Sequence, residues 1–137
     1  AQTIIAIGMI DDVQGKYSIA LQKFKRGYYI QRRILCEDHV DIAATFNVIG
    51  ITRGKMAHYK KAIKYHKKAL KIYTQQLGKD HVDVAVTQNN IGRIYYSLGN
   101  FAKSMVAFTE SLRVMKVALG ESHRNVAASL HNISLIH

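Results

Sequence analysis

The sequence predicts an all-α fold, a right-handed α-solenoid of antiparallel helix pairs about three and a quarter repeats long. The first observation is a 42-residue repeat, which runs without gaps through the 137-residue chain. A fixed period of this length is typical of stacked units that cannot bury their apolar faces alone. The second observation is that apolar residues recur at helical spacing within each repeat. The third is the absence of proline, which permits long uninterrupted helices.

The repeat is visible in positions that keep their chemical character from one unit to the next. These are the series His39, His81 and His123; Gly8, Gly50, Gly92 and Ser134; Tyr17, Tyr59 and Phe101; and Ala20, Ala62 and Ser104. We therefore expect a single array over residues 1–137, with units of about 1–38, 39–80 and 81–122 and a partial unit 123–137. We also expect the chain to be part of a longer repeat protein.

The residue pattern within one repeat predicts two helices. In the middle unit, the first helix (the A helix) runs from Val40 to about Met56, and the second (the B helix) from Tyr59 to Leu77. The turn between them falls at residues 56–58 and corresponds to 14–16 and 98–100, where glycine suits a backbone with positive φ. Gly78 ends the B helix. Applied to the whole chain, this pattern predicts seven helices, the last of them partial.

Small residues mark the places where paired helices approach closely. Gly50 on the A helix and Ala62 on the B helix are such positions, and a larger side chain at either would separate the pair at a cost of about 1–3 kcal/mol. We expect the aromatic series Tyr17, Tyr59 and Phe101 to fill the space between one pair and the next.

These residues resemble the tetratricopeptide repeat. Its hallmarks are an apolar-Gly pair in the A helix, an aromatic residue after the turn, Ala three residues later, and a small residue followed by a large one. In this chain they are matched by Ile49-Gly50, Tyr59, Ala62 and Ala69-Leu70. The usual period of that repeat is about 34 residues. The longer 42-residue period and the sequences at 77–85 and 89–92 are similar to those of repeats in the kinesin light chain class. That class normally has proline after the connector histidine, where this chain has Val40, Val82 and Arg124. HEAT and armadillo arrays have overlapping periods but lack this pattern, so they are the alternative for the fold.

The resemblance implies a function in binding protein segments. Arrays of this kind hold an extended peptide in a concave groove lined by A helices. The groove positions predicted by alignment are Ile5, Met9, Asn47, Ile51, Asn89, Asn90, Arg93, Tyr96, His131 and Leu135. An Asn amide can pair with a peptide backbone and an Arg guanidinium with a carboxylate. The alternative for the Asn residues is local hydrogen bonding between helices.

A second surface is strongly basic. The net charge is +11, and Lys60, Lys64, Lys67, Lys68 and Lys71 gather on the outward, convex face of the middle B helix. This face could dock on an acidic protein, a phospholipid surface or nucleic acid. It could equally be a solvated helix face, and no nucleic-acid-binding signature accompanies it.

The sequence does not predict an enzyme, a metal site or a cofactor. The histidines recur once per repeat, too far apart to share one ion, so we expect them to order the connectors. Cys36 has no identifiable base, and Asp11-Asp12 and Glu37-Asp38 are interpreted as helix-end charges. No apolar run is long enough to span a membrane, and the single cysteine fits a cytoplasmic location.

Three functional hypotheses remain. The first is an adaptor that binds an acidic or carboxylate-ended peptide from another protein in its groove. The second is a scaffold that self-associates through its exposed end helices. The third is an electrostatic docking module that uses the convex lysines.

Overall fold

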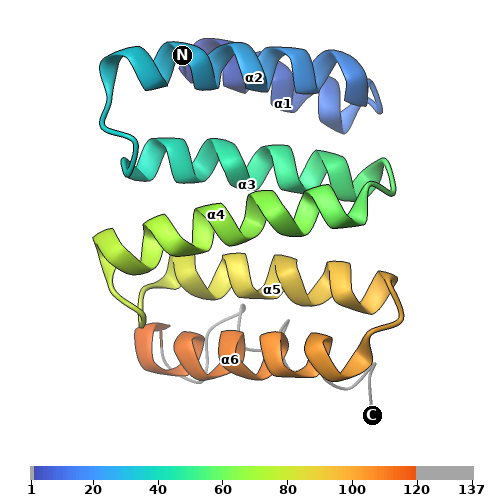
Figure 1. Ribbon diagram of the computed structural model, residues 1–137, viewed down its shortest axis with the longest axis vertical. Helices are drawn as coiled ribbons and strands as arrows, with labels where there is room; N and C mark the ends of the chain where they lie inside the picture. Colours follow the sequence, from blue (N-terminus) through green and yellow to red (C-terminus); the bar gives the residue numbers. More distant parts are fainter. Residues whose placement is uncertain (1, 120–137) are drawn as a thin grey trace. The chain divides into compact units, whose positions relative to one another are not determined.

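The computed structural model describes residues 2–119, and this part of the chain contains six α-helices and no strand (Figure 1). They are α1 (Gln2–Val13), α2 (Tyr17–Ile34), α3 (Val40–Lys55), α4 (Tyr59–Leu77), α5 (Val82–Ser97) and α6 (Phe101–Leu119). The chain divides into two compact units, unit 1 (Ala1–Ile72) and unit 2 (Tyr73–His137). The boundary falls within α4. The predicted seventh helix lies outside the described residues.

The helix boundaries follow the prediction from the repeat. Both helices of the middle repeat begin and end within one residue of their expected positions. The turns between A and B helices contain a residue with positive φ, which is Gly15 at 82°, Ala57 at 62° and Gly99 at 78°. Two of the three turns therefore use glycine, whereas the middle turn places an alanine in the left-handed region, where its Cβ is strained.

The connector histidines are the N-caps of A helices. The backbone N–H of Asp41 donates to Nδ1 of His39 at 3.0 Å, and the N–H of Asp83 donates to Nδ1 of His81 at 3.1 Å. Each histidine satisfies a helix N–H that has no partner within the helix. This confirms that two of the three histidines order the connectors. His123 lies outside the described residues.

The apolar core of unit 1 lies where α1, α2 and α3 meet. Ile5, Ala20, Leu21, Phe24 and Ile49 form one buried cluster. A Cβ placed on Gly8 would lie 2.8 Å from the ring of Phe24, closer than van der Waals contact allows. Glycine at this position thus lets the aromatic ring of the B helix lie against the backbone of the A helix.

Polar pairs also join the helices of unit 1. Thr45 Oγ1 donates to Gln31 Oε1 at 2.7 Å, which links α3 to α2 in the buried interior. Asp11 and Asp12 lie in the last turn of α1, where the helix dipole disfavours carboxylates. They are nevertheless almost buried, because Asp11 pairs with Lys23 and Asp12 with Lys55. These carboxylates do lie at a helix end, as predicted, and their ion pairs in addition connect α1 to α2 and α3.

In unit 2 the helices α5 and α6 pack through small residues. A Cβ on Gly92 would lie 2.7 Å from the ring of Phe108, and Ser104 Oγ donates to the carbonyl of Gly92 at 2.8 Å. Ser104 is fully buried, as is Ala62 in the middle repeat. These contacts confirm the prediction that small residues allow close approach.

The aromatic series behaves less uniformly than predicted. Tyr17 and Tyr59 are half-buried, but Phe101 is exposed. Its ring packs on Tyr96 with the centroids 5.3 Å apart. The expectation that Phe101 is buried between helix pairs is therefore wrong: the side chain is 51% exposed and its ring contacts Tyr96 on its own A helix.

Candidate functional site

Unit 1 has a small apolar cleft on the side of its A helices. The cleft has a volume of about 100 Å³, and its lining includes Met9 on α1 and Ile51 on α3, two residues predicted to face a peptide groove. Phe24 and Val48 also line it. Ile5, which was predicted to face the same groove, is instead buried in the core, because its apolar side chain packs against α2.

Asn47 is engaged within its own helix pair. Its Oδ1 lies 2.8 Å from Nδ1 of His66 on α4, and His66 is only 1% exposed. The imidazole also lies flat against Gly50, since a Cβ there would be 2.8–2.9 Å from three of its ring atoms. The local hydrogen-bonding role considered for these Asn residues is thus observed at Asn47, and contact with a peptide at this position stays a prediction.

Burial lowers the pKa of His66 from 6.5 to about 4. A protonated imidazole here would lose the hydration of its charge without gaining a carboxylate partner. His66 is therefore neutral at physiological pH, and its Nδ1–H donates to Asn47. It stands at the position held by Phe24 and Phe108 in the neighbouring repeats.

In unit 2 the predicted residues lie along α5. Asn89 and Asn90 are half-buried, whereas Arg93 and Tyr96 are exposed. Arg93 and Tyr96 are three residues apart and share one face of the helix. Tyr96 packs on Phe101, so an exposed aromatic pair lies one turn from an exposed guanidinium. His131 and Leu135 lie outside the described residues.

The lysines predicted for the convex surface are exposed on α4. This helix carries six lysines and no acidic residue, and within residues 2–119 none of the six forms an ion pair. Lys68 differs from the others, because its Nζ lies 5.5 Å from the ring centroids of both Phe46 and Tyr65. Such cation–π contacts contribute about 0.5–1 kcal/mol at exposed sites.

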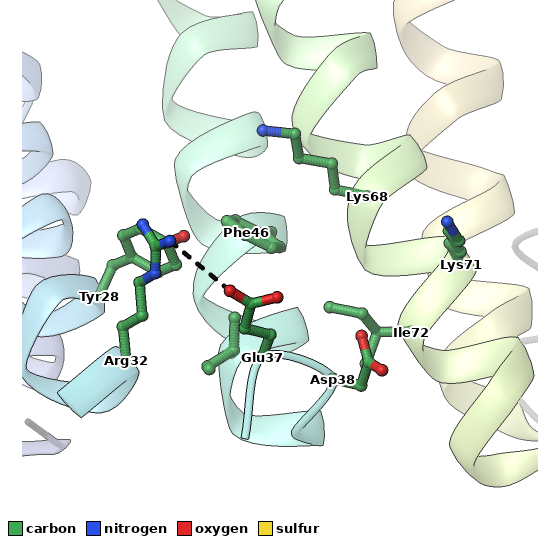
Figure 2. Close-up of a pocket in the computed structure, with 9 residues that line it drawn as sticks. Tyr28, Arg32, Glu37, Asp38, Phe46, Lys68, Lys71 and Ile72 are labelled. Atoms are coloured by element: carbon green, nitrogen blue, oxygen red, sulfur yellow. Dashed lines mark ion pairs between the residues drawn. The ribbon is translucent and has the colours of Figure 1, made fainter. Parts of the chain in front are cut away.

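A larger pocket of about 270 Å³ opens between the B helices α2 and α4 of unit 1. Figure 2 shows Tyr28 and Arg32 on one side and Lys68 and Lys71 on the other, with Phe46 between them. The lining is completed by Glu37 and Asp38 in the connector, Ile42 on α3 and Ile72 on α4. Arg32 and Glu37 form a weak ion pair at 3.6 Å. The floor is thus apolar and the rim carries both signs of charge.

Most of this pocket was missed from the sequence. The sequence predicts Lys68 and Lys71 only as members of a basic face, and it does not predict a site at Tyr28 and Phe46. A signal was available in the repeat, because this position is a cation in the first two units, Arg26 and Lys68, and a carboxylate, Glu110, in the third.

The sequence matches the tetratricopeptide repeat family over residues 1–75, 59–116 and 83–137. The chain belongs to this family. A comparison with curated protein sequences gives no match. The tetratricopeptide architecture confirms the all-α repeat fold and the resemblance on which it was predicted.

Solved structures of similar fold include kinesin light chain-like proteins. BtubC (BKLC) from P. vanneervenii has a TM-score of 0.89 at 17% identity, over 97% of this chain and 53% of that one. A putative kinesin light chain with nearly identical TPR-like repeats from Podosopora anserina has a TM-score of 0.87 at 15% identity, over 98% and 64%. At these identities the likeness concerns the fold, and this tetratricopeptide array spans between half and two thirds of their lengths.

A more distant neighbour is SycD, the type III secretion translocator chaperone of Yersinia enterocolitica. Its TM-score is 0.75 at 11% identity, over 98% of this chain and 81% of SycD. Tetratricopeptide repeats form protein–protein interaction modules, and this chain has that architecture. In the part of the array that the structure describes, no helix has the length and hydrophobicity needed to cross a membrane.

Proposed function

We propose that this chain is an adaptor whose A helices bind an extended protein segment carrying an acidic side chain or a terminal carboxylate. The observation that carries the proposal is the exposed surface of Arg93 beside the aromatic pair of Tyr96 and Phe101. Within residues 2–119, Arg93 has no ion pair. A guanidinium can bind a carboxylate with two parallel hydrogen bonds, and adjacent exposed aromatic rings are typical anchors for a partner's apolar side chain.

The apolar cleft at Met9 and Ile51 supports the same proposal in unit 1. An extended peptide alternates the direction of its side chains, so it can place apolar groups on a helix surface while its backbone and acidic groups face polar residues. The cleft is too small for more than one side chain, as expected for an anchor position rather than for a small-molecule site.

The test measures binding of fluorescently labelled acidic peptides by polarisation, with a pool that includes free and amidated C-termini. Arg93→Ala should weaken the tightest binders by about tenfold, and Arg93→Lys should restore the affinity only in part because it loses the bidentate geometry. Arg26→Ala is the matched control, since Arg26 is an exposed arginine on the B helix α2. Equal binding by wild type and Arg93→Ala would refute the proposal.

Self-association is a second candidate, favoured by the exposed apolar face of α1. Ile7 and Ile10 are 45% and 58% exposed, whereas Ile49 and Thr52, at the equivalent positions of α3, are each 1% exposed. In α3 these positions are covered by the preceding helix pair. A second copy, or a preceding repeat of a longer chain, could cover them in α1. Light scattering should then show a molar mass that rises with concentration for wild type and not for Ile7→Ser/Ile10→Ser; a wild type that stays monomeric would exclude this candidate.

A further inference from the structure

The pocket between α2 and α4 has an internal comparison in the next repeat. Lys68, Lys71 and Asp38 are equivalent to Glu110, Arg113 and Asp80, each one full repeat further along the chain. In unit 2 these three positions form a closed network: Arg113 Nη2 donates to Glu110 Oε1 at 2.6 Å, and Arg113 Nη1 donates to Asp80 Oδ1 at 3.1 Å. The hydrogen bond from Arg113 lowers the pKa of Glu110, as expected for a carboxylate held by a guanidinium.

The same network is incomplete in unit 1. The position of the carboxylate Glu110 is taken by a second cation, Lys68, beside Lys71. Within residues 2–119, neither lysine forms an ion pair. Lys68 instead lies over the rings of Phe46 and Tyr65. Unit 1 therefore has one carboxylate fewer and one cation more than the equivalent site in unit 2.

We propose that an acidic segment of a partner protein binds this pocket and supplies the missing carboxylate. An Asp or Glu side chain of the partner lies between Lys68 and Lys71, where Glu110 pairs with Arg113 in unit 2. Its neighbouring apolar side chain packs on Phe46 and Tyr28 at the floor of the pocket (Figure 2). Attraction of Lys68 to the carboxylate draws its Nζ away from Phe46 and frees the ring face for that side chain.

The rim favours a protein segment over a nucleic acid or a membrane. Glu37 and Asp38 line the same pocket as the two lysines, so a phosphate backbone that approached it would meet both signs of charge. A single carboxylate that reaches only the α4 side avoids this repulsion. The aromatic and aliphatic floor adds a hydrophobic contact that a phosphate group does not use.

This site is separate from the proposed one, since its lining includes no residue of α5 and neither Met9 nor Ile51 of the apolar cleft. Its test is an NMR titration of the isotopically labelled chain with a blocked pentapeptide that contains Phe followed by Glu and Asp. The acidic peptide should shift the amide signals of Tyr28, Phe46, Lys68 and Lys71. A twin peptide with Gln and Asn should bind at least about fivefold more weakly, because it lacks the charge-assisted contacts.

Lys68→Glu is the decisive variant because it copies the next repeat and lets Lys71 pair internally. It should lower the affinity by about tenfold, since it removes one attraction and adds one repulsion. Lys60→Glu makes the same charge change on the same helix about 12 Å away and should change the affinity less than about twofold. Both positions are exposed, and circular dichroism will show that each variant keeps its helices.

Four outcomes would overturn the proposal. They are the absence of shifts at the pocket, equal binding of the two peptides, equal effects of Lys68→Glu and Lys60→Glu, and shifts at these amides by an RNA oligonucleotide or by anionic phospholipid vesicles but not by the peptide. Arg93→Ala, which tests the proposed function, should leave this titration unchanged. Failure at one site is therefore distinguishable from failure at the other.

Discussion

The buried imidazole of His66 makes the stability of unit 1 dependent on pH. Its pKa falls from the ordinary 6.5 to about 4 because burial disfavours the charged ring. The unfolded chain therefore binds this proton more tightly than the folded chain. It follows that the contribution of His66 to stability is complete above pH 6.5 and is lost as the pH falls toward 4.

The magnitude follows from the gap between the two pKa values. At about 1.4 kcal/mol per pH unit, the full loss is about 3 kcal/mol, of which about 2 kcal/mol has occurred by pH 5. The neighbouring repeats suggest a variant that removes this dependence. Phe24 and Phe108 stand where His66 does, and Ile5 stands where Asn47 does, so His66→Phe/Asn47→Ile copies the pairing of the first repeat.

The assay is urea unfolding at pH 7.5 and pH 5.0, followed by circular dichroism. The drop in unfolding free energy between the two pH values should be about 2 kcal/mol smaller in the double variant than in wild type. An NMR titration in which folded His66 becomes protonated near pH 6.5, or an equal drop in wild type and the double variant, would refute the reasoning.

Two further predictions concern the helix ends. Ala57→Gly should raise the free energy of unfolding by about 0.5–1 kcal/mol, because Ala57 has a φ of 62° that glycine adopts without a Cβ clash; Gly99→Ala, at a φ of 78°, should lower it by a similar amount. Urea midpoints that move in the same direction for both would contradict this account. His81→Ala should cost about 1 kcal/mol because it removes the acceptor for the N–H of Asp83. His81→Asn should retain most of the stability in the same measurement, and equal losses for the two variants would show that the cap contributes nothing.

The fold could be predicted because its determinants repeat locally. Helix boundaries depend on turn residues and N-caps, which lie within a few positions of the boundary itself. The series of His39 and His81 and the glycines at 15 and 99 therefore located the helix ends. The repeat also showed where small residues are needed, since Gly50 and Gly92 recur at a fixed distance.

The sites could be predicted only in part, because they depend on contacts between helices. His66 is buried on α4, but its hydrogen-bond partner Asn47 lies 19 positions earlier on α3. Phe101 was expected to be buried from its place in an aromatic series, yet the side chain packs on Tyr96. The pocket at Phe46 draws residues from three helices and a connector. No short motif encodes such a combination.

The repeat nevertheless contains information about function at positions where the residue type differs from one unit to the next. Equivalent positions in stacked repeats share a backbone environment, so a change of residue type between them compares two side chains at one structural site. Where Phe becomes His66, the change is compensated within the chain by Asn47. At the position of Arg26 and Lys68 the third repeat has Glu110, which pairs with Arg113. In the described part of the chain, no carboxylate pairs with Lys68. A substitution that has a partner within the chain stabilises the fold. A charged residue without such a partner at the edge of a pocket can instead pair with a group of a binding partner. For this reason we place the second binding site at Lys68, and Lys68→Glu separates the two interpretations.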